Sequence, residues 1–135
     1  MKETDLYLGC YYRTGIKLIG SQEARLNFED SNNTIRLTMG HFKLFANVPE
    51  WLFSLKPIPL DEEQLDKLGR TDLGIKVQPT SYPDGDLFID ADDNGVVYLR
   101  NCSDGYRFGK ELKYVHQAQN TYKALTGKPL TYKNQ

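Results

Sequence analysis

The sequence has no apolar run that approaches the roughly 20 residues of a membrane-spanning helix. Its two cysteines, Cys10 and Cys102, have no neighbouring cysteine or histidine pair, which excludes a structural zinc site with about four closely spaced ligands. We expect both cysteines to be small buried hydrophobic residues. The G-x-S-x-G, P-loop and G-x-G-x-x-G motifs are also missing, so three common reaction classes have no support.

A strong charge excess is missing as well. The chain carries a net charge of −1, whereas a dedicated nucleic-acid binder usually shows a strong basic excess. The charges are unevenly distributed, because residues 61–105 have a net charge of −7 and residues 106–135 have one of +5. The acidic segment either faces a basic partner or forms a solvated loop region, and the sequence leaves both interpretations open.

The composition is that of a globular protein, with 39% hydrophobic and 26% charged residues. At 135 residues the chain has the length of one domain with a single core, so we expect residues 1–135 to form one domain. The N-terminal stretch MKETDLYLG is polar and acidic where a signal peptide has its apolar segment. We therefore expect a cytoplasmic protein.

The order of turn residues and apolar positions predicts an α+β fold. Four parts follow one another: a β-rich part over residues 1–58, a short helix over 59–70, a β-meander over 71–111 and a C-terminal amphipathic helix over 112–127. In the first part, residues 34–39 alternate apolar and polar side chains and follow residues 24–30 across an Asn-rich turn, which predicts a hairpin. Short strands at this spacing predict a strongly bent antiparallel sheet, an SH3-like small barrel.

The two helices carry clear local signals. Asp61 is a good N-cap, Gln64 stands where it can complete a capping box, and Gly69 supplies the stop. In the C-terminal helix the apolar residues fall on one face: Leu112, Val115, Ala118, Tyr122 and Leu125. The other face carries Lys113, His116, Gln117, Asn120 and Lys123. Gly127, followed by Pro129, ends this helix.

The stretch DADDNGVVYLRN, residues 90–101, matches the first half of an EF-hand calcium loop. The last position of such a loop is a bidentate glutamate, but Asn101 stands there. The flanking segments are also rich in strand formers where an EF-hand has helices. A hairpin with Asp93–Gly95 as a three-residue turn explains the stretch better. Asp90 then lies opposite Tyr98, and apolar and polar residues separate cleanly onto the two faces.

The polar face of this hairpin is the predicted partner-binding surface. It carries aromatic and charged residues of the kind that protein interfaces contain: Phe88, Asp90, Asp92, Tyr98 and Arg100. In the alternative interpretation, a second layer such as the C-terminal helix covers this face and makes Phe88 and Tyr98 part of the core. The sequence leaves both interpretations open.

Few residues suit catalysis. His41 and His116 have no second histidine or carboxylate beside them in the sequence, and a lone histidine of this kind is usually solvated or structural. Two acid pairs are more typical of turn residues than of glycoside chemistry: Asp84/Asp86 and Asp90/Asp92. We therefore expect no enzymatic activity, no cofactor and no metal site.

Three segments resemble a known family: DLYLGCYY near the start, LKPIPLDEEQLDKLG in the middle and KYVHQAQNTYKALTGKPL near the end. They are similar to segments of small proteins encoded by phages and prophages of Bacteroidetes, a family without assigned activity or site residues. Cys10 and Arg70 depart from the usual family pattern, which has Asn and often an aromatic residue at these positions. The resemblance implies a phage or mobile-element gene expressed in a bacterial cytoplasm.

These observations lead to two hypotheses about function. In the first, the chain is a non-enzymatic phage accessory protein that binds a bacterial host protein, for example to inhibit a defence system such as a CRISPR-Cas nuclease bound to its RNA. In the second, the N-terminal sheet is an SH3-like module that binds RNA or DNA. Its phosphate contacts would come from four basic residues: Arg25, Arg36, Lys43 and Lys113. Tyr11 or Tyr12 would then supply the stacking contacts.

Overall fold

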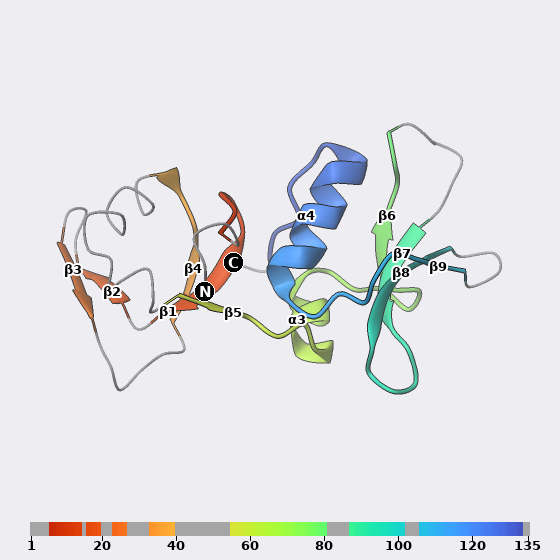
Figure 1. Cartoon of the computed structure of the whole chain (residues 1–135), viewed down its shortest axis with the longest axis horizontal. Coiled ribbons are helices and arrows are strands. Elements are labelled where there is room, and N and C mark those ends of the chain that lie inside the picture. Colours follow the sequence, from red (N-terminus) through yellow and green to blue (C-terminus); the bar gives the residue numbers. More distant parts are fainter. Residues whose placement is uncertain are drawn as a thin grey trace. The chain divides into compact units, whose positions relative to one another are not determined.

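The computed structural model describes residues 6–14, 16–19, 23–26, 33–39, 55–80, 87–101 and 106–133 of the chain (Figure 1). The residue contacts divide the chain into two compact units, unit 1 over Met1–Ile58 and unit 2 over Pro59–Gln135. This boundary coincides with the predicted end of the β-rich part. The described elements are helices and antiparallel strands, which confirms the predicted α+β class. That the chain forms one domain stays a prediction.

Unit 1 contains two antiparallel sheets in its described part. A three-stranded sheet has the order β4-β1-β5, with β1 over Tyr11–Thr14, β4 over Asn33–Arg36 and β5 over Lys56–Pro57. A two-stranded sheet consists of β2 over Ile16–Ile19 and β3 over Glu23–Leu26. These described strands form separate sheets and do not close into a barrel.

The predicted hairpin between residues 24–30 and 34–39 is wrong. β3 pairs with β2, while β4 pairs with β1, where Tyr12 lies opposite Ile35. Only three residues separate β2 from β3, so these strands form a hairpin at a low cost in loop entropy. Tyr11 and Tyr12 point to opposite sides of β1 and are both buried. β1 is the central strand of its sheet, because it pairs with β4 on one edge and with β5 on the other.

The core of unit 1 lies around β1. Among the described residues of this unit, the large side chains that are almost completely buried are Tyr12, Leu37, Leu55 and Ile58. The hydroxyl oxygen of Tyr12 accepts a hydrogen bond from the Tyr7 backbone amide (2.9 Å), so its polar end stays satisfied. Cys10 is 4% exposed, which confirms it as a small buried residue. Cys102 lies outside the described residues.

In unit 2, helix α3 (Glu62–Lys67) begins and ends as predicted. The Asp61 carboxylate accepts a hydrogen bond from the Gln64 backbone amide (Oδ1···N 2.9 Å), and Gly69, with φ of +96°, follows the last turn. The Gln64 side chain, which we expected to complete a capping box, accepts a hydrogen bond from the Tyr132 hydroxyl (Oε1···Oη 2.6 Å). Because Gln64 is 3% exposed, this bond satisfies an acceptor that water does not reach.

The rest of unit 2 is a four-stranded meander with a helix against it, as predicted. The strands follow one another in the sheet: β6 (Ile75–Val77), β7 (Leu87–Ala91), β8 (Val97–Asn101) and β9 (Arg107–Phe108). One face of the sheet is apolar and buried, with Ile75, Val77, Ile89, Val97 and Leu99. Helix α4 (Val115–Thr126) lies beside the sheet and contacts β6 (Figure 1). Among the described residues, no helix has the length and apolar character to cross a bilayer.

The buried side of α4 differs from the prediction. Val115 and Ala118 are fully buried as expected, but His116 and Gln119 are buried too, with 6% and 4% of their surface exposed. The sequence pattern places His116 on the solvent side, and this is wrong. The C-terminal segment of residues 128–133, which we call the tail, explains the burial of Gln119 because it packs beside the helix.

The tail connects α4 to α3. The Gln119 amide nitrogen donates to the Leu130 carbonyl oxygen (2.9 Å), and the Lys133 backbone amide donates to the Lys67 carbonyl oxygen (2.7 Å). Leu130 and Tyr132 are 3% and 8% exposed, so the tail also adds apolar residues to the core. The two helices are therefore held together by residues beyond the end of the second one.

Replacing Tyr132 with phenylalanine removes the donor to the buried Gln64 side chain. We expect Tyr132→Phe to lower the free energy of unfolding by about 1–3 kcal/mol, measured by urea unfolding followed by circular dichroism. The same change at Tyr106, which is 63% exposed, should alter it by less than about 0.5 kcal/mol. Equal effects of the two substitutions contradict a stabilising role for the buried bond.

Candidate binding surface

The hairpin of β7 and β8 has the predicted register. Asp90 lies opposite Tyr98, and Ala91 lies opposite Val97. The Asp92 backbone amide donates to the Val96 carbonyl oxygen (2.8 Å) and closes the three-residue turn. Gly95, the last residue of that turn, has φ of +79°, the left-handed conformation that this turn requires. The interpretation of the stretch as a hairpin is confirmed.

The Asp92 side chain accepts hydrogen bonds from the turn and from β9. Its Oδ1 accepts hydrogen bonds from the backbone amides of Asn94 (2.9 Å) and Val96 (3.0 Å), and its Oδ2 accepts one from the Arg107 guanidinium (3.0 Å). The hydrogen bond from Val96, followed by those from Asn94 and Arg107, lowers the pKa of the Asp92 carboxyl below its ordinary value. The carboxylate therefore stabilises the loop in its charged form.

Asp90 is the centre of an ion-pair network. Its carboxylate is 3.6 Å from Nη1 of Arg70 and 3.9 Å from Nη2 of Arg100, and its side chain is 18% exposed. Burial tends to lower the pKa of Arg70, but the hydrogen bond to Asp66 and the charges of Asp66 and Asp90 outweigh it and raise that pKa. The Arg100 guanidinium also donates to the Leu73 carbonyl oxygen (2.9 Å). These charges are thus paired within unit 2.

Phe88 lies on the same face of the sheet but is only 5% exposed. In the register of the strands it stands between Lys76 and Arg100, whose long aliphatic stems flank it. Phe88 is therefore buried, whereas the alternative interpretation expected a second layer to make both Phe88 and Tyr98 part of the core. Tyr98 is half-buried, and the guanidinium of Arg107 lies over its ring, 4.3 Å from the centroid.

Glycine at position 74 lets the turn before β6 approach Asp90 closely. Its φ is +111°, and a Cβ at this position would lie 2.8 Å from both the Asp90 Cβ and the Ile89 carbonyl oxygen. The same turn presents the carbonyl oxygen of Leu73 to Arg100. A side chain at position 74 would therefore push the turn away from the network.

The edge strand β9 and the residue before it expose two aromatic side chains that the sequence analysis did not single out. Tyr106 is 63% exposed and Phe108 is 38% exposed, and their rings meet edge to face with 5.0 Å between centroids. Phe108 lies opposite Leu99, so it continues the apolar face of the sheet beyond β8. The alternation of Tyr106, Arg107 and Phe108 is the signal that could have revealed this exposed pair.

A groove of about 480 Å³ adjoins this pair, between the segment after β9 and α4. Its apolar lining comes from five residues: Leu99, Phe108, Leu112, Ala124 and Leu125. Lys110 and Glu111 stand at its polar side, and Glu111 forms an ion pair with Lys113 (3.7 Å). We call this feature the β9 groove.

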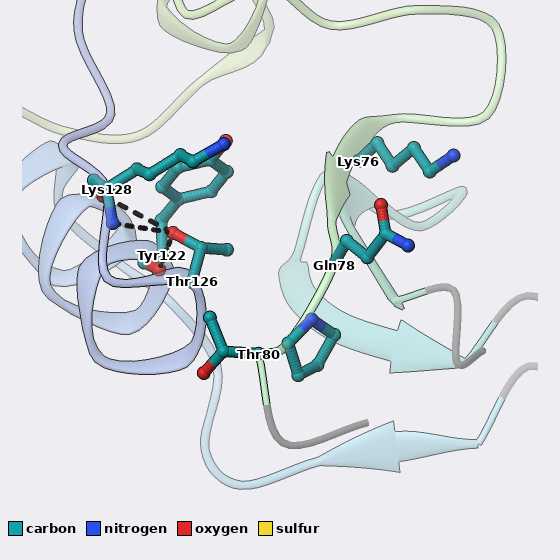
Figure 2. Close-up of a pocket in the computed structure, with 7 residues that line it drawn as sticks. Lys76, Gln78, Thr80, Tyr122, Thr126 and Lys128 are labelled. Atoms are coloured by element: carbon teal, nitrogen blue, oxygen red, sulfur yellow. Dashed lines mark hydrogen bonds between the residues drawn. The ribbon is translucent and has the colours of Figure 1, made fainter. Parts of the chain in front are cut away.

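A second cavity of about 500 Å³ lies between β6 with the residues after it and the end of α4. Figure 2 shows its lining: Lys76, Gln78, Pro79, Thr80, Tyr122, Thr126 and Lys128. We call this feature the β6 cavity. The sequence analysis placed no site here, because the two segments that form it are far apart in the chain.

The structure describes three of the four basic residues of the nucleic-acid hypothesis, in two different units. Arg36 is exposed on unit 1, with Nε 3.2 Å from the Gly9 carbonyl oxygen, Arg25 lies in β3, and Lys113 is exposed on unit 2. Lys43 lies outside the described residues. Tyr11 and Tyr12 are 5% and 0% exposed, so the expectation that either one stacks on a base is wrong.

Of the residues considered for catalysis, the structure describes His116, Asp90 and Asp92. The buried ring of His116 lies parallel to that of Tyr114, with 5.7 Å between centroids. Both carboxylates of the pair Asp90/Asp92 take part in the contacts given above. His41 and the pair Asp84/Asp86 lie outside the described residues.

Comparison of the chain with protein-family models, with curated proteins and with solved structures finds no match.

The lowered pKa of Asp92 makes the stability of unit 2 depend on pH. Because the folded-state pKa lies below the unfolded value of about 3.9, this stabilisation is present above that value and is lost as pH falls through the folded pKa. We expect Asp92→Asn to be less stable than the wild type at pH 7. This difference should shrink below about pH 4. Urea unfolding at both pH values measures it, and a difference that stays constant contradicts the account.

Alanine at position 74 should destabilise the protein more than alanine at position 95. Both glycines have positive φ, so each substitution incurs the cost of left-handed backbone, about 1–2 kcal/mol. Only at Gly74 would the added Cβ meet other atoms, and overpacking adds about 1–3 kcal/mol. Urea unfolding of Gly74→Ala and Gly95→Ala measures the difference, and equal losses contradict the close approach to Asp90.

Proposed function

We propose that this chain is a non-enzymatic binding protein that acts by contact with a bacterial host protein. The observation that carries the proposal is the exposed aromatic pair of Tyr106 and Phe108 beside the apolar β9 groove. Exposed apolar patches of this kind typically mark protein interfaces, where large aromatic side chains contribute most of the binding energy. A partner residue that fills the groove would bury Phe108 without any change in the sheet.

The predicted partner-binding surface, the polar face of the β7–β8 hairpin, lies on the other side of the sheet from Tyr106 and Phe108. The strand β9 connects the two. Arg107 lies between Tyr106 and Phe108 in the sequence but points to the opposite face, where it contacts Tyr98 and Asp92. The ion pairs of Asp90 and Arg100 lie on that same face. A partner that binds across β9 would meet aromatic side chains on one side and paired charges on the other.

The surrounding charge favours an acidic partner segment. Residues 106–133 carry six Lys and Arg but a single acidic residue, Glu111, whose charge is paired with Lys113. Lys110 is exposed at the side of the β9 groove. We therefore propose that the occupant is a segment of the host protein with an apolar anchor residue flanked by Asp or Glu.

The biological setting rests on the sequence alone. The three segments that resemble proteins of Bacteroidetes phages and prophages support a role as a phage accessory protein. Inhibition of a host defence system, such as a CRISPR-Cas nuclease, is the specific form that we propose. We propose that this inhibition works by stoichiometric binding, because the sequence contains no recognisable catalytic motif.

For unit 1 we also propose a strongly bent sheet of the SH3-like type. Its five described strands are short, and β1 is shared as the central strand between β4 and β5. An experimental structure in which β2 and β3 join this sheet at its open edge supports the proposal. A flat sheet with β2 and β3 packed apart contradicts it.

The binding function is tested by retention of host proteins on the tagged chain from a nuclease-treated bacterial lysate. We expect a defined host protein to be retained by the wild type and to be retained at least about tenfold less by Phe108→Ala, because truncation of a central aromatic anchor typically costs 2 kcal/mol or more. Leu73→Ala is the matched control, since Leu73 is 53% exposed and lies on the turn before β6. It should retain the protein like the wild type.

Three results contradict the proposal. One is the absence of any protein retained at micromolar concentration. Another is equal loss with Leu73→Ala and Phe108→Ala. The third is retention that disappears on nuclease treatment and falls steeply with salt, which is the result expected of a nucleic-acid module.

A further inference from the structure

Strand β9 is an open edge of the four-stranded sheet. It pairs with β8 on one side, and no other described segment pairs with it. Residues 106–111 are all exposed, so this edge is accessible to solvent. At the opposite edge, the segment that continues β6 is bonded to α4, because the Thr80 backbone amide donates to the Leu125 carbonyl oxygen (3.0 Å). The sheet can therefore accept a further strand at β9.

The backbone groups of Arg107 face this open edge. The Asn101 backbone amide donates to the Tyr106 carbonyl oxygen (2.8 Å), so Tyr106 directs its backbone groups toward β8. In an antiparallel pair, successive residues of a strand direct their N–H and C=O groups to alternate sides. The backbone groups of Phe108, which lies opposite Leu99, therefore also point to β8, and those of Arg107 point away from it.

We propose that the host-protein segment binds as an extended strand that pairs antiparallel with β9, with an acidic residue opposite Arg107 and an apolar residue opposite Phe108. This inference rests on the proposed function and specifies how the partner segment binds. Every described strand pair of this sheet is antiparallel. Because side chains of a strand alternate between its faces, the acidic residue lies beside Arg107 on the polar face and the apolar residue beside Phe108 at the β9 groove.

The charge of Arg107 distinguishes such a segment from a second copy of this chain. Within β9 only Arg107 directs backbone groups outward, so two paired β9 strands would place their Arg107 side chains directly opposite each other. Like charges at such positions are destabilising, whereas opposite charges stabilise the pair. Arg100, opposite Arg107 on β8, adds further positive charge. The Arg107 side chain is 49% exposed beside Asp92, so a second carboxylate can reach it.

Gly109 limits the length of the pairing. Its φ of +71° departs from strand conformation, so the chain is no longer extended after Phe108. The edge therefore offers a partner the N–H and C=O of Arg107, and contacts in the β9 groove must supply most of the affinity. Phe108 is part of the groove lining, so the partner residue opposite Phe108 is the one that the groove would receive.

The substitutions Arg107→Pro and Arg107→Ala test the backbone pairing. Both remove the side chain, but only proline removes the N–H. Proline is tolerated on an edge strand where that N–H faces solvent, and urea unfolding checks that both variants are folded. We expect Arg107→Pro to retain the host protein at least about fivefold less than Arg107→Ala, because it loses a backbone hydrogen bond to the partner. Equal retention by the two folded variants overturns the inference.

A short synthetic peptide of alternating aspartate and leucine, blocked at both ends, tests the same pairing directly. Antiparallel pairing directs the aspartate N–H groups toward β9 and the leucine N–H groups away from it. We expect the peptide to shift the amide NMR signals of Arg107 and Phe108 at millimolar concentration or below. N-methylation of the aspartates should weaken binding about fivefold or more, and N-methylation of the leucines should leave it within about twofold. No shift, equal losses with the two methylated peptides, or equal binding of a lysine–leucine peptide would overturn the inference.

These tests separate the inference from the proposed function. If Phe108→Ala loses the host protein while Arg107→Pro and Arg107→Ala retain it equally, the host protein binds at the groove in another form, such as a helix, and only the inference fails. If the wild type retains no host protein, the proposed function fails, and the peptide titration alone decides whether β9 accepts an acidic strand.

Discussion

The three-residue turn Asp93–Gly95 fixes the register of β7 against β8, and the two faces of the meander depend on this register. A shift by one residue would move every side chain of the hairpin to the other face. In the observed register Ile89 and Leu99 face each other on the buried side, while Asp90 faces Tyr98 on the other. The carboxylate of Asp92 holds the turn through two backbone amides, so a charged residue at the loop determines which apolar residues meet α4.

The two faces then differ in what they offer a partner. On the polar face the charges of Asp90, Asp92 and the arginines around them are already paired within the molecule before a partner approaches. On the apolar face the sheet extends beyond the cover of α4 at β9, where Phe108 remains partly exposed. We infer that the polar face limits which partners can approach β9, while the aromatic pair supplies most of the affinity.

Local features could be predicted from the sequence because residues near each other in the chain produce them. The Asp61 cap, the Gly95 turn and the alternation in β7 and β8 are of this kind. The pairing of β4 with β1 could not be predicted, because it joins segments that are distant in the chain and depends on the burial of Tyr11 and Tyr12. The burial of His116 was missed because a helical pattern does not include the residues that pack around the helix. The β6 cavity escaped prediction because its walls come from distant segments.

The most direct test of the central claim, that a host protein binds at β9, is photo-crosslinking inside bacterial cells. A photoreactive phenylalanine analogue is placed at position 108 in one variant and at position 73 in another, both exposed positions of unit 2. The account predicts a specific cross-link to one host protein from position 108 and none from position 73. Cross-links from position 73 alone, or to nucleic acid from both positions, would contradict it.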